Sequence, residues 1–279
     1  LQRAVAAQAR TGQALNTSET IDRNASWAAK RAALELVYAA GLSPRRARAF
    51  EGFCEREGQG LVDFATWCAL ADMHGEDWRS WPAGLQSPTS PQVDEFRAEQ
   101  AAEIDFFRWL RVLEEQLAAT QRLAKEAGMA LGVIHDLAVG VHGSGADSWG
   151  LGDALARGIE VGAPPDQFNQ IGQNWSQPPW RPDRLAELGY APYRDMLRTV
   201  LRDSGGIRVD HIIGLFRLWW IPQGMSPGEG TYVHYDHEAL IGILCLEAHR
   251  AGAVVVGEDL GVVQPFARDF MKERGILGT

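Results

Sequence analysis

Three short apolar segments of the second half of the sequence, each carrying an acid near its end, constrain the fold most strongly. They lie at residues 129–141, 206–218 and 252–257. Helical spacing and helix-start signals predict helices between and after them, from about 184 or 192 to 202, and at about 237–251 and 265–274. Strands that alternate with helices form parallel sheets with crossover helices. The sequence therefore predicts an α/β fold with neighbouring parallel strands.

The acids of these segments are Asp136, Asp210 and Glu258. In parallel α/β folds, catalytic groups gather at the carboxyl ends of the strands. A strand-end acid can instead cap the following helix. Asp259 is a candidate for that structural role, because alternation along the strand sends it opposite to Glu258. Three such acids on three consecutive strands favour a catalytic site.

Two of the acids have different expected environments. Arg208 lies two residues before Asp210, so both side chains face the same side of the strand, and the guanidinium favours a charged carboxylate. Glu258 follows three valines, and desolvation there favours the neutral acid. A charged nucleophile beside a protonated acid suits retaining glycoside chemistry, for which the two carboxyls lie about 5–5.5 Å apart.

Composition narrows the classes of partner. The net charge of −9 leaves no basic excess for nucleic acid or an anionic membrane, and it is compatible with a neutral, polyhydroxylated ligand. No segment is long and apolar enough to span a bilayer, and the N-terminus lacks a signal core. The three cysteines show neither a zinc pattern nor a disulfide framework, which indicates thiols in a reducing cytoplasm.

The first half of the sequence is helical in pattern. Apolar spacing and breakers predict helices over 27–40, 44–57 and 61–73, followed by one long helix from residue 91 to about 127. We expect a helical subdomain over residues 1–89 and a catalytic domain over residues 90–279. Because the chain starts without methionine and stops at the approach to another strand, we also expect a fragment of a longer protein.

Three segments carry a resemblance to a known family: GGIRVDHIIGLFRLWWIP, GAPPDQFNQIGQNW and VVVGEDLG. Together they resemble the 4-α-glucanotransferases, also called amylomaltases or disproportionating enzymes, which are relatives of the α-amylases. The resemblance covers about residues 90–279, and the helical front is similar to the family's inserted subdomain more loosely. It implies part of a (β/α)8 barrel, with strands matching the third to fifth, and chemistry that needs no metal or organic cofactor.

The resemblance also implies roles for individual residues. Asp210 matches the nucleophile and Glu258 the acid/base of a retaining transfer between maltooligosaccharides or other α-1,4-glucans. The positions that match residues around the nucleophile, the cleft and the loop over the sugar subsites are Arg208, His211, Asp136, Asp166, Gln173 and Trp175. The family's third catalytic Asp belongs to a later strand than those present here.

Other interpretations stay open. An amylase-like α-glucan hydrolase would use the same two carboxylates, and a non-catalytic glucan-binding or helical interaction module could be built around residues 20–127. The 164–175 loop offers hydrogen bonds and one indole face to a sugar, or it is a surface loop pinned by Trp175. For Trp219 and Trp220, packing is favoured over stacking on sugars.

Overall fold

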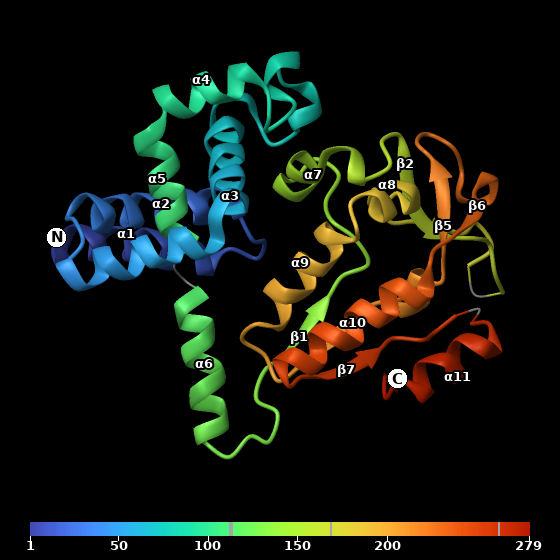
Figure 1. Cartoon of the computed structure of the whole chain (residues 1–279). Coiled ribbons are helices and arrows are strands. Elements are labelled where there is room, and N and C mark those ends of the chain that lie inside the picture. Colours follow the sequence, from blue (N-terminus) through green and yellow to red (C-terminus); the bar gives the residue numbers. More distant parts are fainter. Residues whose placement is uncertain (112–113, 168, 262) are drawn as a thin grey trace. The chain divides into compact units, whose positions relative to one another are not determined.

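The computed structural model describes residues 1–111, 114–167, 169–261 and 263–279 (Figure 1). The chain divides into two compact units, namely Leu1–Ala69 with Arg97–Val112, and Leu70–Phe96 with Leu113–Thr279. The expected boundary between residues 89 and 90 falls inside the second unit. The assignment of residues 1–89 as an inserted subdomain stays a prediction.

The first unit is helical. Its helices are α1 (Gln2–Ala14), α2 (Arg23–Ala39), most of α3 (Pro44–His74) and α5 (Ala101–Leu110). Gly58 has φ 58° and ψ −140°, which kinks α3 and divides it into the two helices that the sequence predicts. The positive φ is one that glycine adopts without a steric penalty. Phe53 and Ala65 of α3 and Phe107 of α5 are buried.

The prediction of one long helix from residue 91 is wrong. The helix α4 (Pro91–Glu99) ends at Gln100, whose φ of −108° and ψ of 25° are not helical, before α5 begins. Buried Phe96 belongs to the second unit, whereas buried Phe107 belongs to the first. The sequence contains no glycine or proline at the break, so no local signal marks the end of α4. Residues 112–113 lie outside the described residues, and α6 (Glu114–Glu126) follows.

A four-stranded parallel sheet organises the second unit. Its strands, in spatial order, are β1 (Ile134–Leu137), β4 (Gly206–Val209), β7 (Val254–Gly257) and β8 (Leu277–Gly278). Every neighbouring pair is parallel. The predicted parallel arrangement of three neighbouring strands is confirmed, and the end of the chain does supply a further strand.

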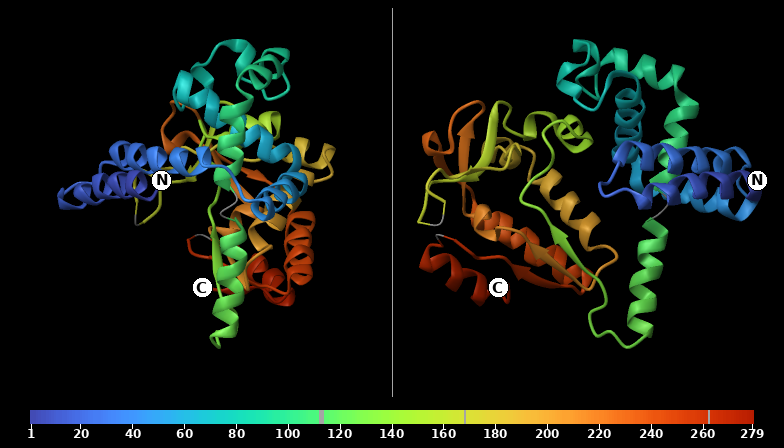
Figure 2. Two further views of the ribbon diagram at one scale, coloured as in Figure 1. Left: turned by 90° about the vertical axis from the view of Figure 1, so that its left-hand side faces the viewer. Right: turned by 180° about the vertical axis from the view of Figure 1, so that it is seen from behind.

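Helices cover one face of this sheet. Figures 1 and 2 show α9 (Ala191–Leu201) and α10 (His237–Ala251) running along its strands, and α11 (Pro265–Glu273) precedes β8. Ile207, Val209 and Val255 are buried in the core with these helices. Val254 and Val256 point to the other face and are only half-buried. Within the described residues, only one face of β7 is therefore fully buried.

A second, antiparallel sheet was not predicted. Its order is β3 (Gln173–Asn174), β2 (Ile159–Ala163), β5 (Arg217–Pro222) and β6 (Thr231–His234). The short helices α7 (Ala146–Leu151) and α8 (Pro182–Glu187) belong to the connecting segments. The segment 206–218, expected as one strand, contributes to both sheets. His211 has φ 47° and ψ 51°, so the strand ends there and a 3-10 turn, Ile212–Leu215, redirects the chain.

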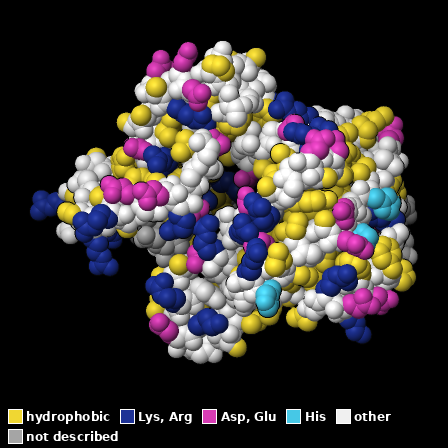
Figure 3. All heavy atoms as spheres, in the orientation of Figure 1, with side chains coloured by type: hydrophobic (Ala, Val, Ile, Leu, Met, Phe, Trp, Pro, Cys, Tyr) yellow, Lys and Arg dark blue, Asp and Glu magenta, His cyan; other side chains and the backbone are white. Residues whose placement is uncertain are grey.

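The distribution of surface charge and the hydropathy of the helices are relevant to the kind of partner. Figure 3 shows Lys and Arg side chains interspersed with Asp and Glu over the face that it presents. Among the described residues, no helix is long and apolar enough to cross a membrane.

Candidate active site

Two neighbouring parallel strands deliver the predicted catalytic acids to one edge of the sheet. Val209 of β4 pairs with Gly257 of β7, so the residues that follow them leave the sheet at the same level. The backbone N–H of Asp210 donates to Leu137 O at 2.9 Å, and that of Glu258 donates to Val209 O at 2.9 Å. The parallel ladder therefore fixes both backbones where the side chains project.

Arg208 joins the acids of the first two strands. It lies opposite Asp136 in the sheet and donates from Nη1 to Asp136 Oδ1 at 2.6 Å and from Nη2 to Asp210 Oδ1 at 2.9 Å. The hydrogen bond to Asp136, followed by the one to Asp210, raises the pKa of the Arg208 guanidinium. The predicted contact between Arg208 and Asp210 is present. Because all three side chains are partly exposed, the pairs orient the carboxylates more than they stabilise the fold.

The carboxylate of Glu258 is held by two backbone amides. The N–H of His211 donates to Oε2 at 2.8 Å, and that of Leu260 donates to Oε1 at 3.2 Å. Since His211 follows Asp210 directly in the chain, the acid of β7 lies beside the acid of β4. The expectation that one acid is charged and the other neutral stays a prediction.

His211 links the acids to the loop that ends at Trp175. Its left-handed backbone directs its N–H to Glu258, and its ring meets the Trp175 indole edge-on, with centroids 5.2 Å apart. Burial lowers the pKa of the His211 imidazole, and the nearby carboxylates of Glu258 and Asp210 offset part of that effect. The Trp175 Nε1 donates to Gln173 Oε1 at 3.0 Å, so both loop residues are oriented together.

Asp166 has a local structural contact instead. Its Oδ1 accepts the backbone N–H of Asn169 at 2.6 Å, and its own N–H donates to Asn169 O at 2.9 Å. These two hydrogen bonds join Asp166 to Asn169 within the loop. A role of Asp166 in sugar binding stays a prediction.

Asp259, the acid that directly follows Glu258, forms an ion pair with α11. Its side chain points away from the acids, as alternation predicts, and is only 8% exposed. It accepts from Arg268 Nε of α11 at 2.8 Å, and this hydrogen bond is the main cause that lowers the pKa of Asp259. The expected helix cap is not formed, because the N-cap position of α11 is Gln264.

A cavity of about 110 Å³ adjoins the strand ends. Asp210 and His211 line it together with apolar side chains from α9 and α10, among them Tyr193, Met196 and Leu240. The backbone segment that carries the nucleophile candidate therefore rests on apolar packing. Among the described residues, no group of three or more His, Cys, Asp or Glu side chains could hold a metal ion.

The comparisons with known proteins come from sequence and structure. The family model for 4-alpha-glucanotransferase matches residues 2–279. This chain belongs to the 4-alpha-glucanotransferase family. The 4-alpha-glucanotransferase of Mycobacterium bovis is 59% identical over 262 residues, which cover 94% of this chain and 36% of the relative. That of Haemophilus influenzae is 36% identical, over 90% of this chain and 38% of the relative.

Solved structures agree. The amylomaltase from Corynebacterium glutamicum has a TM-score of 0.80 and 51% identity over 94% of this chain and 35% of its own. The amylomaltase from Streptococcus agalactiae, solved in complex with acarbose, has a TM-score of 0.82 at 18% identity over 92% of this chain and 53% of its own, which shows the fold alone. The chain spans about a third of the length of the curated relatives it matches most fully.

Within this 4-alpha-glucanotransferase family chain, the structure brings most of the predicted residues together. One connected set of contacts joins Asp136, Arg208, Asp210, His211, Glu258, Trp175 and Gln173. The amide of Leu260 was not predicted as part of the site. A backbone N–H is present in every residue except proline, so its role as a donor cannot be predicted from the residue type. The nearest indication in the sequence is Gly261, which has φ 90° in the structure.

Proposed function

We propose that the full-length protein containing this chain is a 4-α-glucanotransferase that transfers α-1,4-glucan segments between maltooligosaccharides with retention. The observation that carries the proposal is the hydrogen bond from the His211 amide to Glu258, because it joins the two acids at one edge of the parallel sheet. Family membership supports the same activity.

In this mechanism, Glu258 donates a proton to the leaving glycosidic oxygen while Asp210 attacks the anomeric carbon. Arg208 engages Asp210 Oδ1, which leaves Oδ2 for the attack. The C–O bond to the leaving glucan breaks, and a covalent glycosyl-enzyme intermediate forms with inverted configuration. We assign the transferable proton to Glu258 Oε1, because its amide contact is the longer of the two.

The second step restores the α-linkage. The 4-hydroxyl of an acceptor glucan loses its proton to Glu258 and attacks the same anomeric carbon, and Asp210 leaves as a carboxylate. Transfer exceeds hydrolysis when an acceptor sugar occupies the site in place of water. The loop that carries Gln173 and Trp175 is our candidate for that selection, since an indole and an amide suit a pyranose ring. Asp136 and Asp166 are proposed to contact sugar hydroxyls.

We further propose that β1, β4 and β7 are the third to fifth strands of a (β/α)8 barrel. The parallel order of the sheet and the likeness to amylomaltases support this assignment. The net charge of −9 supports an uncharged glucan over nucleic acid as the partner. A cytoplasmic location stays a prediction from the cysteine pattern.

The test is incubation of the full-length protein with maltotriose and analysis of the products. A ladder of longer oligosaccharides supports transfer, whereas glucose and maltose alone support the amylase-like alternative. Glu258→Gln should lower the rate by about 10²–10⁴-fold, because it removes general acid–base catalysis. Asp210→Asn should remove at least as much, because no covalent intermediate forms. Asp269→Asn, an exposed acid of α11, is the matched control.

Full activity in both Asp210→Asn and Glu258→Gln would contradict the mechanism. That result, together with retained glucan binding, would favour the non-catalytic binding module. Circular dichroism of each variant checks that the fold is kept.

A further inference from the structure

A second cavity, of about 210 Å³, is lined by residues far in sequence from the two catalytic acids. Its walls come from residues 78–86, from residues 152–160 that lead into β2, and from residues that follow β3. Neither Asp210 nor Glu258 lines it. The proposed mechanism does not use it, although its polar side chains converge on one space.

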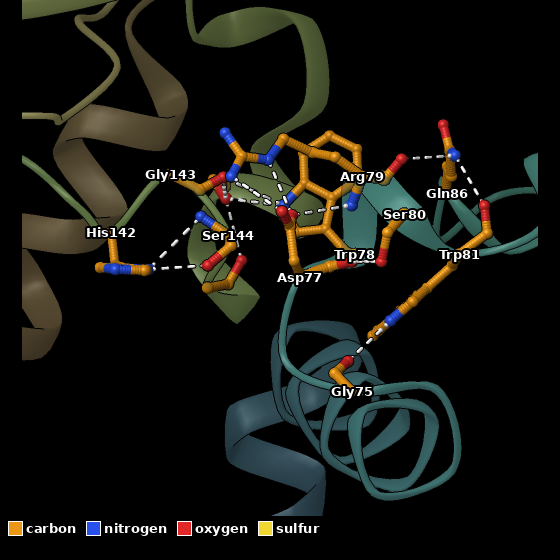
Figure 4. A network of polar contacts seen from close by, with 12 residues as sticks. Gly75, Asp77, Trp78, Arg79, Ser80, Trp81, Gln86, His142, Gly143 and Ser144 are labelled. Atoms are coloured by element: carbon orange, nitrogen blue, oxygen red, sulfur yellow. Dashed lines mark hydrogen bonds and ion pairs between the residues drawn. The ribbon is translucent and has the colours of Figure 1, made fainter.

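Hydrogen bonds hold the 78–86 segment at this wall, and Figure 4 shows those of Trp78 and Gln86. The Trp78 Nε1 donates to Ser148 Oγ at 2.9 Å and to Gly143 O at 3.2 Å, and the ring is only 5% exposed. The Gln86 Nε2 donates to Arg79 O at 3.0 Å and to Trp81 O at 2.7 Å. Within the part of the chain that the structure describes, this leaves Gln86 Oε1 as an acceptor for a ligand.

The Arg79 guanidinium is fixed by its neighbour Asp77. Nε donates to Oδ1 at 2.7 Å and Nη2 to Oδ2 at 3.0 Å, and Figure 4 shows this pairing. The same hydrogen bonds are the main cause that raises the pKa of Arg79, and the negative charge of Glu160 adds to it. Nη1 takes no part in the pair, so it is a donor for a ligand.

The opposite wall supplies one more cation and one acid. The Arg157 guanidinium lies over the Trp78 ring, 5.4 Å from its centroid, and no acid among the described residues forms an ion pair with it. Glu160 Oε2 accepts from Asn174 Nδ2 at 2.6 Å, which leaves Oε1 as an acceptor. The cavity thus presents donors and acceptors whose positions other contacts already hold.

The charges decide the class of ligand. Asp77 neutralises Arg79, and Glu160 lines the same cavity as Arg157, so the site has no net positive charge for an anion. Fixed donors and acceptors of both signs match the hydroxyls of a neutral sugar, each of which donates and accepts. We propose that this cavity is a second saccharide-binding site, which takes one or two glucosyl units of an α-glucan. The choice of an α-glucan rests on the proposed function.

The site is connected to the loop of the catalytic cleft. Asn174 Nδ2 donates to Glu160, and Asn174 Oδ1 accepts the backbone N–H of Ser176 at 2.7 Å. Trp175, which contacts His211, lies between these two residues. A sugar bound to Glu160 therefore stabilises the segment that orients Trp175. The second site couples glucan binding outside the cleft to the order of the loop inside it.

The test is calorimetric titration of the full-length protein carrying Asp210→Asn, which prevents turnover, with maltotriose. Two classes of binding site are expected. Arg157→Ala combined with Glu160→Gln should weaken one class by at least about tenfold and leave the other unchanged. Glu160→Gln alone, which keeps an acceptor for Asn174, should weaken the same class less. Arg194→Ala combined with Glu238→Gln, at a partly exposed position of α9 and an exposed position of α10, is the control.

A single binding class in Asp210→Asn, or two classes unchanged in the cavity variant, would overturn the proposal. Inorganic phosphate that competes with maltotriose for the second class would also overturn it, because the cavity would then be an anion site. The transfer activity is measured separately by the maltotriose products. If the protein binds maltotriose at this cavity but forms no products longer than maltotriose, the proposed function is refuted and the second saccharide-binding site is still supported.

Discussion

The two sheets of the second unit contribute different kinds of side chain to the candidate active site. The parallel sheet holds charged groups in fixed positions, because Asp136, Arg208, Asp210 and Glu258 lie on or directly after its strands. The antiparallel sheet carries aromatic and amide groups on strands and loops, among them Trp175 beside β3. Strands held by hydrogen-bonded pairing position charged side chains precisely, whereas side chains on loops can adjust to a bound ligand.

The sheets also differ in how they are packed. Ile207 of β4 belongs to the main core with α9, α10 and α11. Ile221 of β5 is equally buried, at 0% exposure, yet it lies outside that cluster. On β5 and β6, Trp219 packs edge-on against Tyr232, with centroids 4.8 Å apart, and Trp220 packs on the core, which agrees with the packing role expected for these tryptophans.

The largest expected effect compares these two isoleucines. Truncation of a buried isoleucine to alanine costs about 2–5 kcal/mol, depending on how far the surroundings relax. We expect Ile207→Ala near the upper end and Ile221→Ala near the lower end, because the main core cannot collapse as easily. Chemical denaturation of both variants measures the difference. An equal or larger loss for Ile221→Ala would show that the antiparallel sheet is as tightly packed as the parallel one.

One glycine in each sheet allows a second test of how tightly the two sheets are packed. A Cβ at Gly162 of β2 would lie 1.9 Å from the backbone oxygen of Gln173, whereas one at Gly206 of β4 would meet the Val254 Cγ2 at 2.7 Å. A backbone atom cannot move aside as a side chain can. Gly162→Ala should therefore cost about 1–3 kcal/mol and weaken glucan binding through the loop, and Gly206→Ala should cost less.

The control for this pair is Gly242→Ala in α10, where a Cβ would meet nothing within 4 Å. It should be neutral or stabilising, because alanine favours a helix over glycine. The expected order of the two variants would be wrong if Gly206→Ala lowered the thermal stability more than Gly162→Ala.

A smaller effect is expected at His211, where the two sheets meet through Trp175. Its φ of 47° is strained for any residue with a Cβ and relaxed for glycine. His211→Gly and His211→Ala both remove the ring contact, but only glycine relieves the backbone. The glycine variant should be more stable than the alanine variant by about 1 kcal/mol in urea titrations. Equal stabilities would mean that the left-handed backbone stores no strain.

The smallest effect is the pH dependence of the same residue. Burial lowers the pKa of His211 in the folded chain, so the unfolded chain binds more protons below about pH 6.5. Stability should therefore be complete above pH 6.5 and fall as the pH drops towards the folded pKa, by less than about 1.4 kcal/mol per pH unit. His211→Gln should remove this slope, and replacement of the exposed His249 should not. A slope that persists in His211→Gln would assign it to other groups.

The sequence predicted the parallel sheet well and the antiparallel sheet not at all. The parallel strands are apolar runs that end at acids, and both the hydrophobic pattern and the intervening helices are local signals. In the antiparallel sheet, β3 pairs with β2 and β6 pairs with β5, but the pairing of β2 with β5, which joins the sheet, connects residues more than fifty positions apart in the chain. Their pairing depends on contacts that no local pattern contains.

The sequence by itself determined that charged groups gather at the ends of parallel strands, because side-chain alternation and strand polarity follow from backbone geometry. It also placed Arg208 on the same side as Asp210. Only the tertiary structure decided that the His211 amide holds Glu258, that Trp175 packs on His211, and that α4 and α5 separate at Gln100. These features depend on which distant surfaces meet, and packing free energy decides that over the whole fold rather than within one segment.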